Sequence, residues 1–105
     1  MTGKSIVAKR LGEARTRLGL SQKKLGISAG MDEFSASPRI NQYERGKHTP
    51  DLRTIERIAK VLAVPSAYFY AVEDDLAEWI LAFAEASPTA RRRSIKILGK
   101  SGRNS

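Results

Sequence analysis

Apolar residues recur at helical spacing along most of the chain, and glycines and prolines separate the segments that contain them. The first segment has one apolar stripe with spacings of four, three and four residues, formed by Val7, Leu11, Ala14 and Leu18. Arg10 and Arg15 lie off this stripe, so the pattern places them outside the core. Gly19 supplies a natural C-terminal stop for this first helix.

A second, short helix is predicted between Ser21 and Gly30. Ser21 can cap its first turn, and Leu20 can pack on Leu25 as a hydrophobic staple. The residues that follow, MDEFSA at 31–36, show no periodicity, so we predict a loop there.

A third helix is predicted to begin at Ser37 and Pro38. This pair is typical of a capping residue followed by proline at the first helical position, where the missing N–H costs nothing. Ile40 and Tyr43 then face the core together with residues of the neighbouring helices, and Gly46 ends the helix.

A fourth helix is predicted to begin after Asp51, which can cap it, and to end before Pro65. Its apolar face is formed by Leu52, Ile55, Ala59 and Leu62. Residues 66–71 contain three aromatic side chains, enough for one helical turn that closes the bottom of the core.

Two further helices are predicted beyond residue 72. Acids at 73–75 favour a helix start, and the apolar stripe that follows consists of Leu76, Trp79, Ile80 and Phe83. The last helix is predicted from Ser87 and Pro88 to Gly99, and residues 100–105 are predicted to fray. Because no segment shows convincing strand alternation, the pattern predicts an all-α protein.

The length of 105 residues allows one compact unit with at most a small appendage. Its charge is uneven. Residues 1–72 carry 13 bases and 6 acids (+7), residues 73–90 five acids and no base (−5), and residues 91–105 six bases and no acid (+6). The total of +8 favours polyanions such as nucleic acid or an acidic membrane face. The pattern predicts a binding module over 1–72 and an extension with another role over 73–105.

Several classes of site are excluded by composition. The chain has no cysteine, and His48 is its single histidine, so neither a disulfide nor a zinc site is expected. No apolar stretch approaches the roughly 18 residues needed to cross a bilayer. We therefore expect a cytoplasmic protein without metal, cofactor or membrane partner.

Short motifs between residues 18 and 62 carry a more specific signal. They are GLSQ at 19–22, Leu25 with Gly26, YERGK at 43–47, Pro50, and IAKVL at 58–62. This stretch resembles the Cro/repressor-type, or xenobiotic-response-element (XRE), helix-turn-helix family. The resemblance covers roughly residues 6–71 and implies a five-helix all-α domain, to which the remaining residues add a short C-terminal helical extension.

One departure from the family pattern is visible. Between Gly30 and the third helix the chain has about four residues more than the usual family turn, the segment MDEF. The family pattern therefore does not align residue by residue across the turn, and it realigns from Ser37 to Gly46.

The resemblance implies that the chain binds double-stranded DNA with its third helix in the major groove, which is about 12 Å wide. The DNA-binding residues that it implies are Gln22, Ser37, Pro38, Arg39, Asn41, Gln42, Arg45, Lys47 and His48. For Gln22 and for the residues of the third helix the plain alternative is a solvated surface residue.

Chemistry gives these residues different roles. Gln22 resembles the family's phosphate clamp, because an amide at a helix start can donate to an anion. Asn41 or Gln42 can pair with adenine, and Arg39 can pair with guanine. Pro38 offers only apolar contact, for instance to a thymine methyl group.

The loop after the third helix has another expected role. The family lays this loop, with Arg45, Lys47 and His48, along the sugar-phosphate backbone. Glu44 is expected to pair with a basic residue inside the domain, since its charge does not suit a contact with DNA.

The basic tail leaves several interpretations open. Arg91–Arg93, next to apolar residues 95–98, can form a second DNA arm, a membrane-surface helix, or the solvated face of a helix packed on Trp79 and Phe83. We favour the last. The apolar stripes beyond residue 72 are an available dimer surface, with the fourth and fifth helices as the alternative.

The leading hypothesis is a dimeric, sequence-specific transcriptional regulator that binds operator DNA, a repressor of bacterial or phage type. The alternative is an antitoxin or adaptor with the same fold, whose C-terminal helices grip a partner protein. An enzyme is disfavoured because no carboxylate pair, Ser/His/Asp set or glycine-rich phosphate loop can be assembled.

Overall fold

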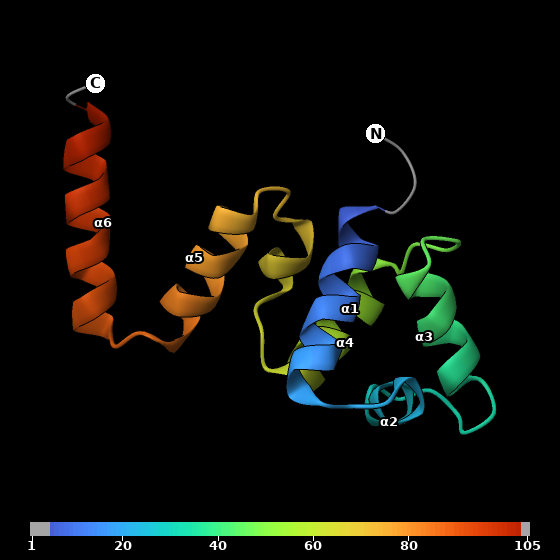
Figure 1. Cartoon of the computed structure of the whole chain (residues 1–105). Coiled ribbons are helices and arrows are strands. Elements are labelled where there is room, and N and C mark those ends of the chain that lie inside the picture. Colours follow the sequence, from blue (N-terminus) through green and yellow to red (C-terminus); the bar gives the residue numbers. More distant parts are fainter. Residues whose placement is uncertain (1–4, 104–105) are drawn as a thin grey trace.

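The computed structural model describes residues 5–103, and every regular element in that range is a helix (Figure 1). The elements are α1 (Ile6–Leu18), α2 (Gln22–Ser28), α3 (Ala36–Glu44), α4 (Leu52–Leu62), the 3-10 helix η1 (Ser66–Tyr70), α5 (Asp74–Glu85) and α6 (Pro88–Arg103). The all-α prediction is confirmed, with the predicted order of segments.

A single core lies between α1, α2, α3, α4 and η1. Its fully buried large side chains are Leu11, Leu25, Ile40, Ile55, Ile58, Tyr68 and Phe69. Each of the aliphatic ones contributes about 1.5 to 3 kcal/mol when removed from water. The core positions predicted on the second and third helices are therefore confirmed, including Tyr43, and so are Ile55, Ala59 and Leu62 on the fourth.

Local capping explains where the helices begin and end. The Ser21 hydroxyl accepts a hydrogen bond from the backbone N–H of Lys24, and the Asp51 carboxylate accepts one from that of Thr54, so both predicted caps are confirmed. At the end of α1, Gly19 has a φ of 78°, a left-handed conformation that residues with a Cβ adopt at a cost.

The start of α3 differs from the prediction. α3 begins at Ala36, with Ser35 as its N-cap, so Ser37 and Pro38 are its second and third residues. The Asp32 carboxylate accepts hydrogen bonds from the Ser35 hydroxyl (2.7 Å) and backbone N–H (2.9 Å), which hold the pKa of Asp32 below its ordinary value. This turn starts the helix early, and Pro38 is tolerated because N–H groups in a first turn have no intrahelical partner.

Two predicted core positions are exposed, and one position predicted outside the core is buried. Leu18 ends α1 and Leu52 begins α4, and both are more than half exposed because neighbouring elements do not cover these helix ends. Arg10 was expected off the apolar stripe, yet only 2% of it is exposed.

Arg10 connects α1 to the start of α5. Its Nε donates to the carbonyl oxygen of Ala71 (2.9 Å), its Nη2 to that of Val72 (3.2 Å), and its Nη1 to the Asp74 carboxylate (3.0 Å). The hydrogen bonds from Arg10 and then Lys9 hold the pKa of Asp74 below its ordinary value. These hydrogen bonds satisfy the buried guanidinium of Arg10. They also fix the position at which α5 begins.

The C-terminal helix projects from the rest of the molecule. α6 stands apart from α1–α4, with α5 between them (Figure 1). The radius of gyration is 15.7 Å, whereas a compact chain of this length has about 13 Å. α6 also continues to Arg103, so residues 100–103, predicted to fray, are helical; residues 104–105 lie outside the described range.

The crossing of α2 and α3 depends on a very close approach at Gly26. A Cβ atom built on Gly26 would lie 2.6 Å from the Cβ of Ala36 and 2.8 Å from its Cα. Real Cβ atoms do not come this close, and the neighbour is backbone with a methyl group, which cannot swing away. Only glycine therefore permits this crossing as it stands.

We expect Gly26→Ala to lower the free energy of unfolding by about 1 to 3 kcal/mol, the usual cost of overpacking. Gly12→Ala is the control, because its new Cβ would meet only the Glu44 carboxylate at 3.9 Å, an ordinary contact. Alanine favours the helix by up to about 1 kcal/mol, so this control should be neutral or stabilising. Urea unfolding followed by circular dichroism measures both, and equal effects would contradict the crossing argument.

Candidate nucleic-acid interface

The outer face of α3 presents the polar residues predicted to meet DNA. Pro38, Arg39 and Gln42 are exposed, while Ser37 and Asn41 are half-buried at the edges of the same face. Ile40 and Tyr43 anchor the opposite face in the core. α3 therefore has one side fixed by packing and one side available to a partner.

Gln22, the first residue of α2, contacts α3 directly. Its Nε2 donates to Oδ1 of Asn41 (3.3 Å) and to Oε1 of Glu44 (3.1 Å). An amide nitrogen has two donors, so a phosphate contact from Gln22 has to replace one of these bonds. The bond to Asn41 uses the Asn41 amide oxygen and leaves the Asn41 amide nitrogen free to donate. An asparagine that reads adenine donates from this nitrogen to N7 of the base.

Glu44 is buried beneath this contact and pairs with Arg15 of α1. Arg15 donates from Nε and Nη2 to the two carboxylate oxygens, the second bond measuring 3.1 Å, and its Nη1 donates to the carbonyl oxygen of Leu20 at 2.8 Å. The hydrogen bond with Glu44 raises the pKa of Arg15. The expected internal partner of Glu44 is thus confirmed, and the pair joins α1, α2 and α3 at the back of the polar face.

Arg39 lies along α3 against Tyr43. Its Nη2 donates to the Tyr43 hydroxyl (3.0 Å), and its guanidinium carbon lies 6.0 Å from the ring centroid. A guanidinium carries five N–H donors, so the bond to Tyr43 leaves others for a base edge. Tyr43 thus belongs to the core and also supports a predicted base-contacting residue.

Three basic or titratable side chains follow α3 on one exposed loop. Arg45, Lys47 and His48 are all exposed. The backbone N–H of Lys47 donates to the Gln42 carbonyl oxygen (3.0 Å), so the loop turns directly back at the end of α3. The structure thus brings the predicted backbone-contacting residues next to the predicted base-contacting ones.

Two features were missed from the sequence. The first is Arg10, whose burial has no local signal because its carbonyl partners lie more than 60 residues away. The second is Phe34, which is 88% exposed on the turn before α3 and lay inside the segment predicted as a loop. An aromatic residue in an aperiodic segment gives no indication of whether it is buried.

The described residues give no support for a metal site or for a membrane-spanning helix. Between residues 5 and 103, no group of three or more histidine, aspartate or glutamate side chains is placed to hold a metal ion. In that same range, no helix has both the length and the apolar character required to traverse a bilayer.

Comparison with known proteins agrees with the geometry. A family model described as helix-turn-helix matches residues 11–69, more than half of the chain, and these residues hold α2, α3 and the polar face. The chain belongs to the Cro/repressor-type (XRE) helix-turn-helix family. This is a family of DNA-binding transcription regulators and not of enzymes.

Two curated relatives are HTH-type transcriptional regulators described as uncharacterized, one from Sinorhizobium medicae (strain WSM419) and one, R00410, from Rhizobium meliloti (strain 1021). Each is 34% identical over 64 residues, which is 61% of this chain. The match covers 43% of each relative, so the chain aligns with less than half of the length of these regulators.

Two solved structures are similar to the structure of this chain. The transcriptional regulator BswR is 49% identical, with a TM-score of 0.82 over 89% of this chain and 92% of that one. The restriction-modification controller protein C.AhdI from Aeromonas hydrophila is 30% identical, with a TM-score of 0.54 over 61% of this chain and 91% of that one. The likeness to BswR therefore extends beyond the helix-turn-helix region into the C-terminal extension.

We expect Arg15→Ala to lower the free energy of unfolding by roughly 2 to 3 kcal/mol, less than for a fully buried pair, because it leaves Glu44 with little solvent and without its cation. Lys23→Ala is the control. Lys23 and Glu33 form an exposed ion pair with a distance of 3.6 Å, and such a pair contributes at most about 1 kcal/mol to the free energy of unfolding. Urea unfolding measures both. A loss no larger for Arg15→Ala than for Lys23→Ala would contradict the role of this pair.

Proposed function

We propose that this protein is a sequence-specific repressor that binds operator DNA as a dimer, with α3 of each subunit in the major groove. Residues 1–72 form the DNA-binding domain and residues 73–105 the extension that supports assembly. The proposal rests chiefly on the outer face of α3. There, exposed side chains that can pair with base edges lie beside an exposed loop with basic residues.

Within this proposal the residues divide into two groups. Arg39, Asn41 and Gln42 contact base edges, while Ser37 and Pro38 contact the groove at the start of α3. The second group holds the sugar-phosphate backbone and consists of Gln22, Arg45, Lys47 and His48. Groups that hold phosphate add affinity on any sequence, whereas groups that meet base edges discriminate.

The need for a dimer follows from the size of this face. One α3 of nine residues covers only a few base pairs, and two subunits that bind half-sites about one helical turn apart double the contact. An operator of this kind is an inverted repeat, and its occupation at a promoter would block transcription.

We expect Gln42→Ala to change base preference at particular positions of the site, each contact contributing about 1 to 3 kcal/mol of discrimination. Lys47→Ala should instead weaken all sequences by a similar factor. Selection of bound duplexes from a random pool, followed by titration of the selected site and its single-base variants, measures both. Equal losses on every sequence from both variants would contradict the two roles.

We expect binding to fall steeply with salt. A dimer with about 6 to 10 phosphate contacts should lose roughly 10³ to 10⁵ in affinity between 50 and 200 mM salt. Lys47→Ala should lower the slope of log affinity against log salt by about one. Fluorescence anisotropy with the selected duplex measures these slopes, and a flat salt dependence would count against backbone contacts by the basic loop.

A further inference from the structure

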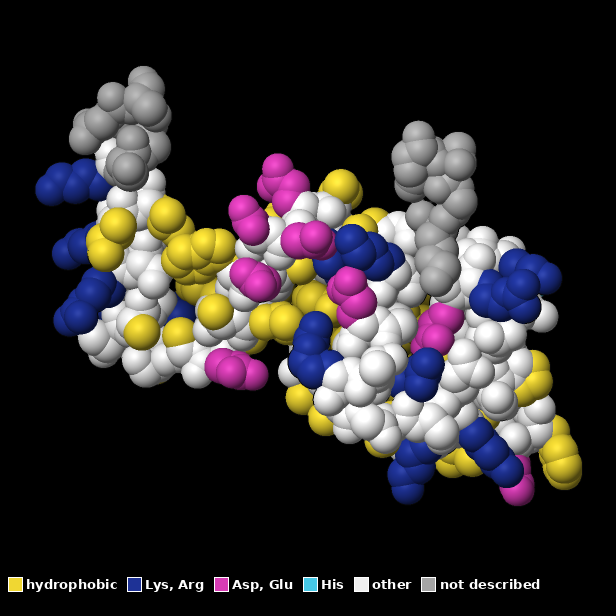
Figure 2. Space-filling model, in the orientation of Figure 1, with side chains coloured by type: hydrophobic (Ala, Val, Ile, Leu, Met, Phe, Trp, Pro, Cys, Tyr) yellow, Lys and Arg dark blue, Asp and Glu magenta, His cyan; other side chains and the backbone are white. Residues whose placement is uncertain are grey.

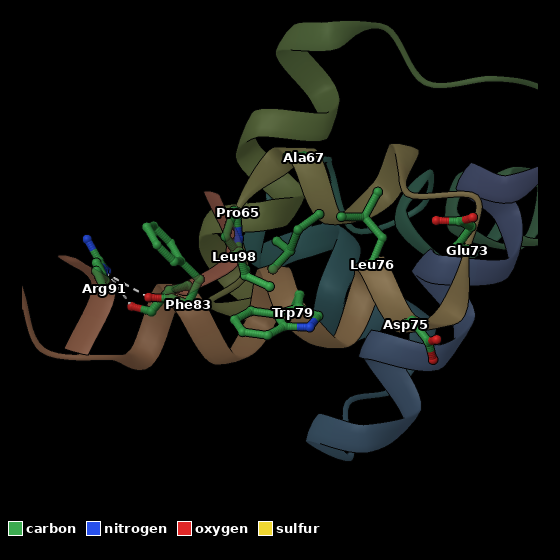
Figure 3. Close-up of a pocket in the computed structure, with 11 residues that line it drawn as sticks. Pro65, Ala67, Glu73, Asp75, Leu76, Trp79, Phe83, Arg91 and Leu98 are labelled. Carbon is green, nitrogen blue, oxygen red and sulfur yellow. Dashed lines mark hydrogen bonds between the residues drawn. The ribbon is translucent and has the colours of Figure 1, made fainter. Parts of the chain in front are cut away.

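An open apolar groove lies between η1, α5 and α6 (Figure 3). It has a volume of about 780 Å³ and is lined chiefly by Pro65, Leu76, Trp79, Ile80, Phe83 and Leu98. Three of these, Leu76, Trp79 and Leu98, remain about half exposed. An exposed apolar surface of this kind usually marks an interaction site.

Arg91 fixes the opening of the groove. Its Nε donates to the carbonyl oxygen of Phe83 and its Nη2 to that of Ala84, both at 2.8 Å, and the guanidinium lies 5.0 Å from the Phe83 ring centroid. The carbonyl groups at the end of α5 are thereby satisfied, and the start of α6 is tied to it. Beyond this contact α6 diverges, so that Leu98 faces Trp79 across the groove (Figure 3).

The two sides of this region carry opposite charge. Hydrophobic side chains gather between α5 and α6, bases line the outer edge of α6, and acids cover the start of α5 (Figure 2). Among the side chains described, those of residues 5–100, Asp74 is the one member of α5 and α6 that forms an ion pair, and its partners are Lys9 and Arg10 of α1. The charges of α5 and α6 are therefore largely unpaired with each other within one chain.

We propose that this groove receives the α5–α6 segment of a second copy of the chain. An isologous two-fold interface brings the same patch from both subunits together, so the patch must complement itself in shape and charge. The segment meets both conditions, because it combines an apolar groove, an apolar stripe on α6, an acidic helix and a basic helix. The proposal names the dimer partner surface for the DNA binding proposed above, and so rests on that function.

The elongated shape supports a second copy over an unrelated partner. α6 has 16 residues and is therefore about 24 Å long, yet its stripe residues Ile95 and Leu98 remain more than half exposed. Two copies that interlock in this way cover both stripes and both grooves at once. A partner of only acidic or only basic surface would match one helix and repel the other.

Leu98→Asp tests the groove, and Ile97→Asp is its matched control. Leu98 lines the groove, whereas Ile97, the next residue on α6, does not and is 62% exposed. Both variants change the same helix by the same charge, and neither touches the core. We expect wild type and Ile97→Asp to be dimers by sedimentation at tens of micromolar, and Leu98→Asp to associate about 30-fold more weakly or worse.

Trp79 gives a second readout, because it is the single tryptophan of the chain and lines the groove. Its emission should shift to longer wavelength when wild type is diluted into the monomer range, and Leu98→Asp should show the shifted emission at every concentration. A monomeric wild type, a dimer that survives Leu98→Asp, or dissociation by Ile97→Asp would each overturn the proposal. So would a stable complex with another protein in place of the homodimer.

DNA titration separates this inference from the proposed function. If Leu98→Asp is monomeric and binds the selected operator much more weakly, both stand. If Leu98→Asp remains a dimer and binds the operator as well as wild type, the interface is wrong and the function stands. If wild type dimerises through the groove but prefers no DNA sequence, the function is wrong and the interface stands.

Discussion

The placement of α3 depends on how closely α2 and α3 approach at Gly26. With no Cβ at Gly26, α2 can pass against Ala36 at a separation that another residue would prevent. That crossing brings Gln22 within hydrogen-bond distance of Asn41 and Glu44, and it lets Glu44 meet Arg15 of α1. The lack of a side chain at Gly26 thus allows α3 to lie this close to α2, and the partly buried ion pair between Arg15 and Glu44 helps to hold it there.

Much of this arrangement could be predicted from the sequence because its determinants are local. Residue type and spacing are enough to predict the caps at Ser21 and Asp51, the end of α1 at Gly19 and the side of α3 that faces the core. The start of α3 was predicted two residues late, because the Ser-Pro pair at 37–38 is typical of a helix start while the Asp32 turn gives a weaker signal.

What could not be predicted depends on contacts between distant parts of the chain. The burial of Arg10 requires the carbonyl groups of Ala71 and Val72, which no periodicity relates to α1. The hydrogen bonds of Gln22 to Asn41 and Glu44 are of the same kind, since they join residues 19 and 22 positions apart in the sequence. The resemblance to the family is enough to name the residues of the candidate interface. The hydrogen bonds by which these side chains support one another can be seen only in the three-dimensional structure.

The joint at Arg10 has a consequence for how the molecule responds to acidity. A guanidinium stays protonated throughout the physiological range, backbone carbonyls do not titrate, and Asp74 has a lowered pKa. The guanidinium, the carbonyl groups and the Asp74 carboxylate therefore keep their charges near neutral pH, so this connection between α1 and the start of α5 does not depend on pH in that range. In the dimer proposed above, this connection would keep each recognition helix in the same place relative to the α5–α6 groove as the pH changes within that range.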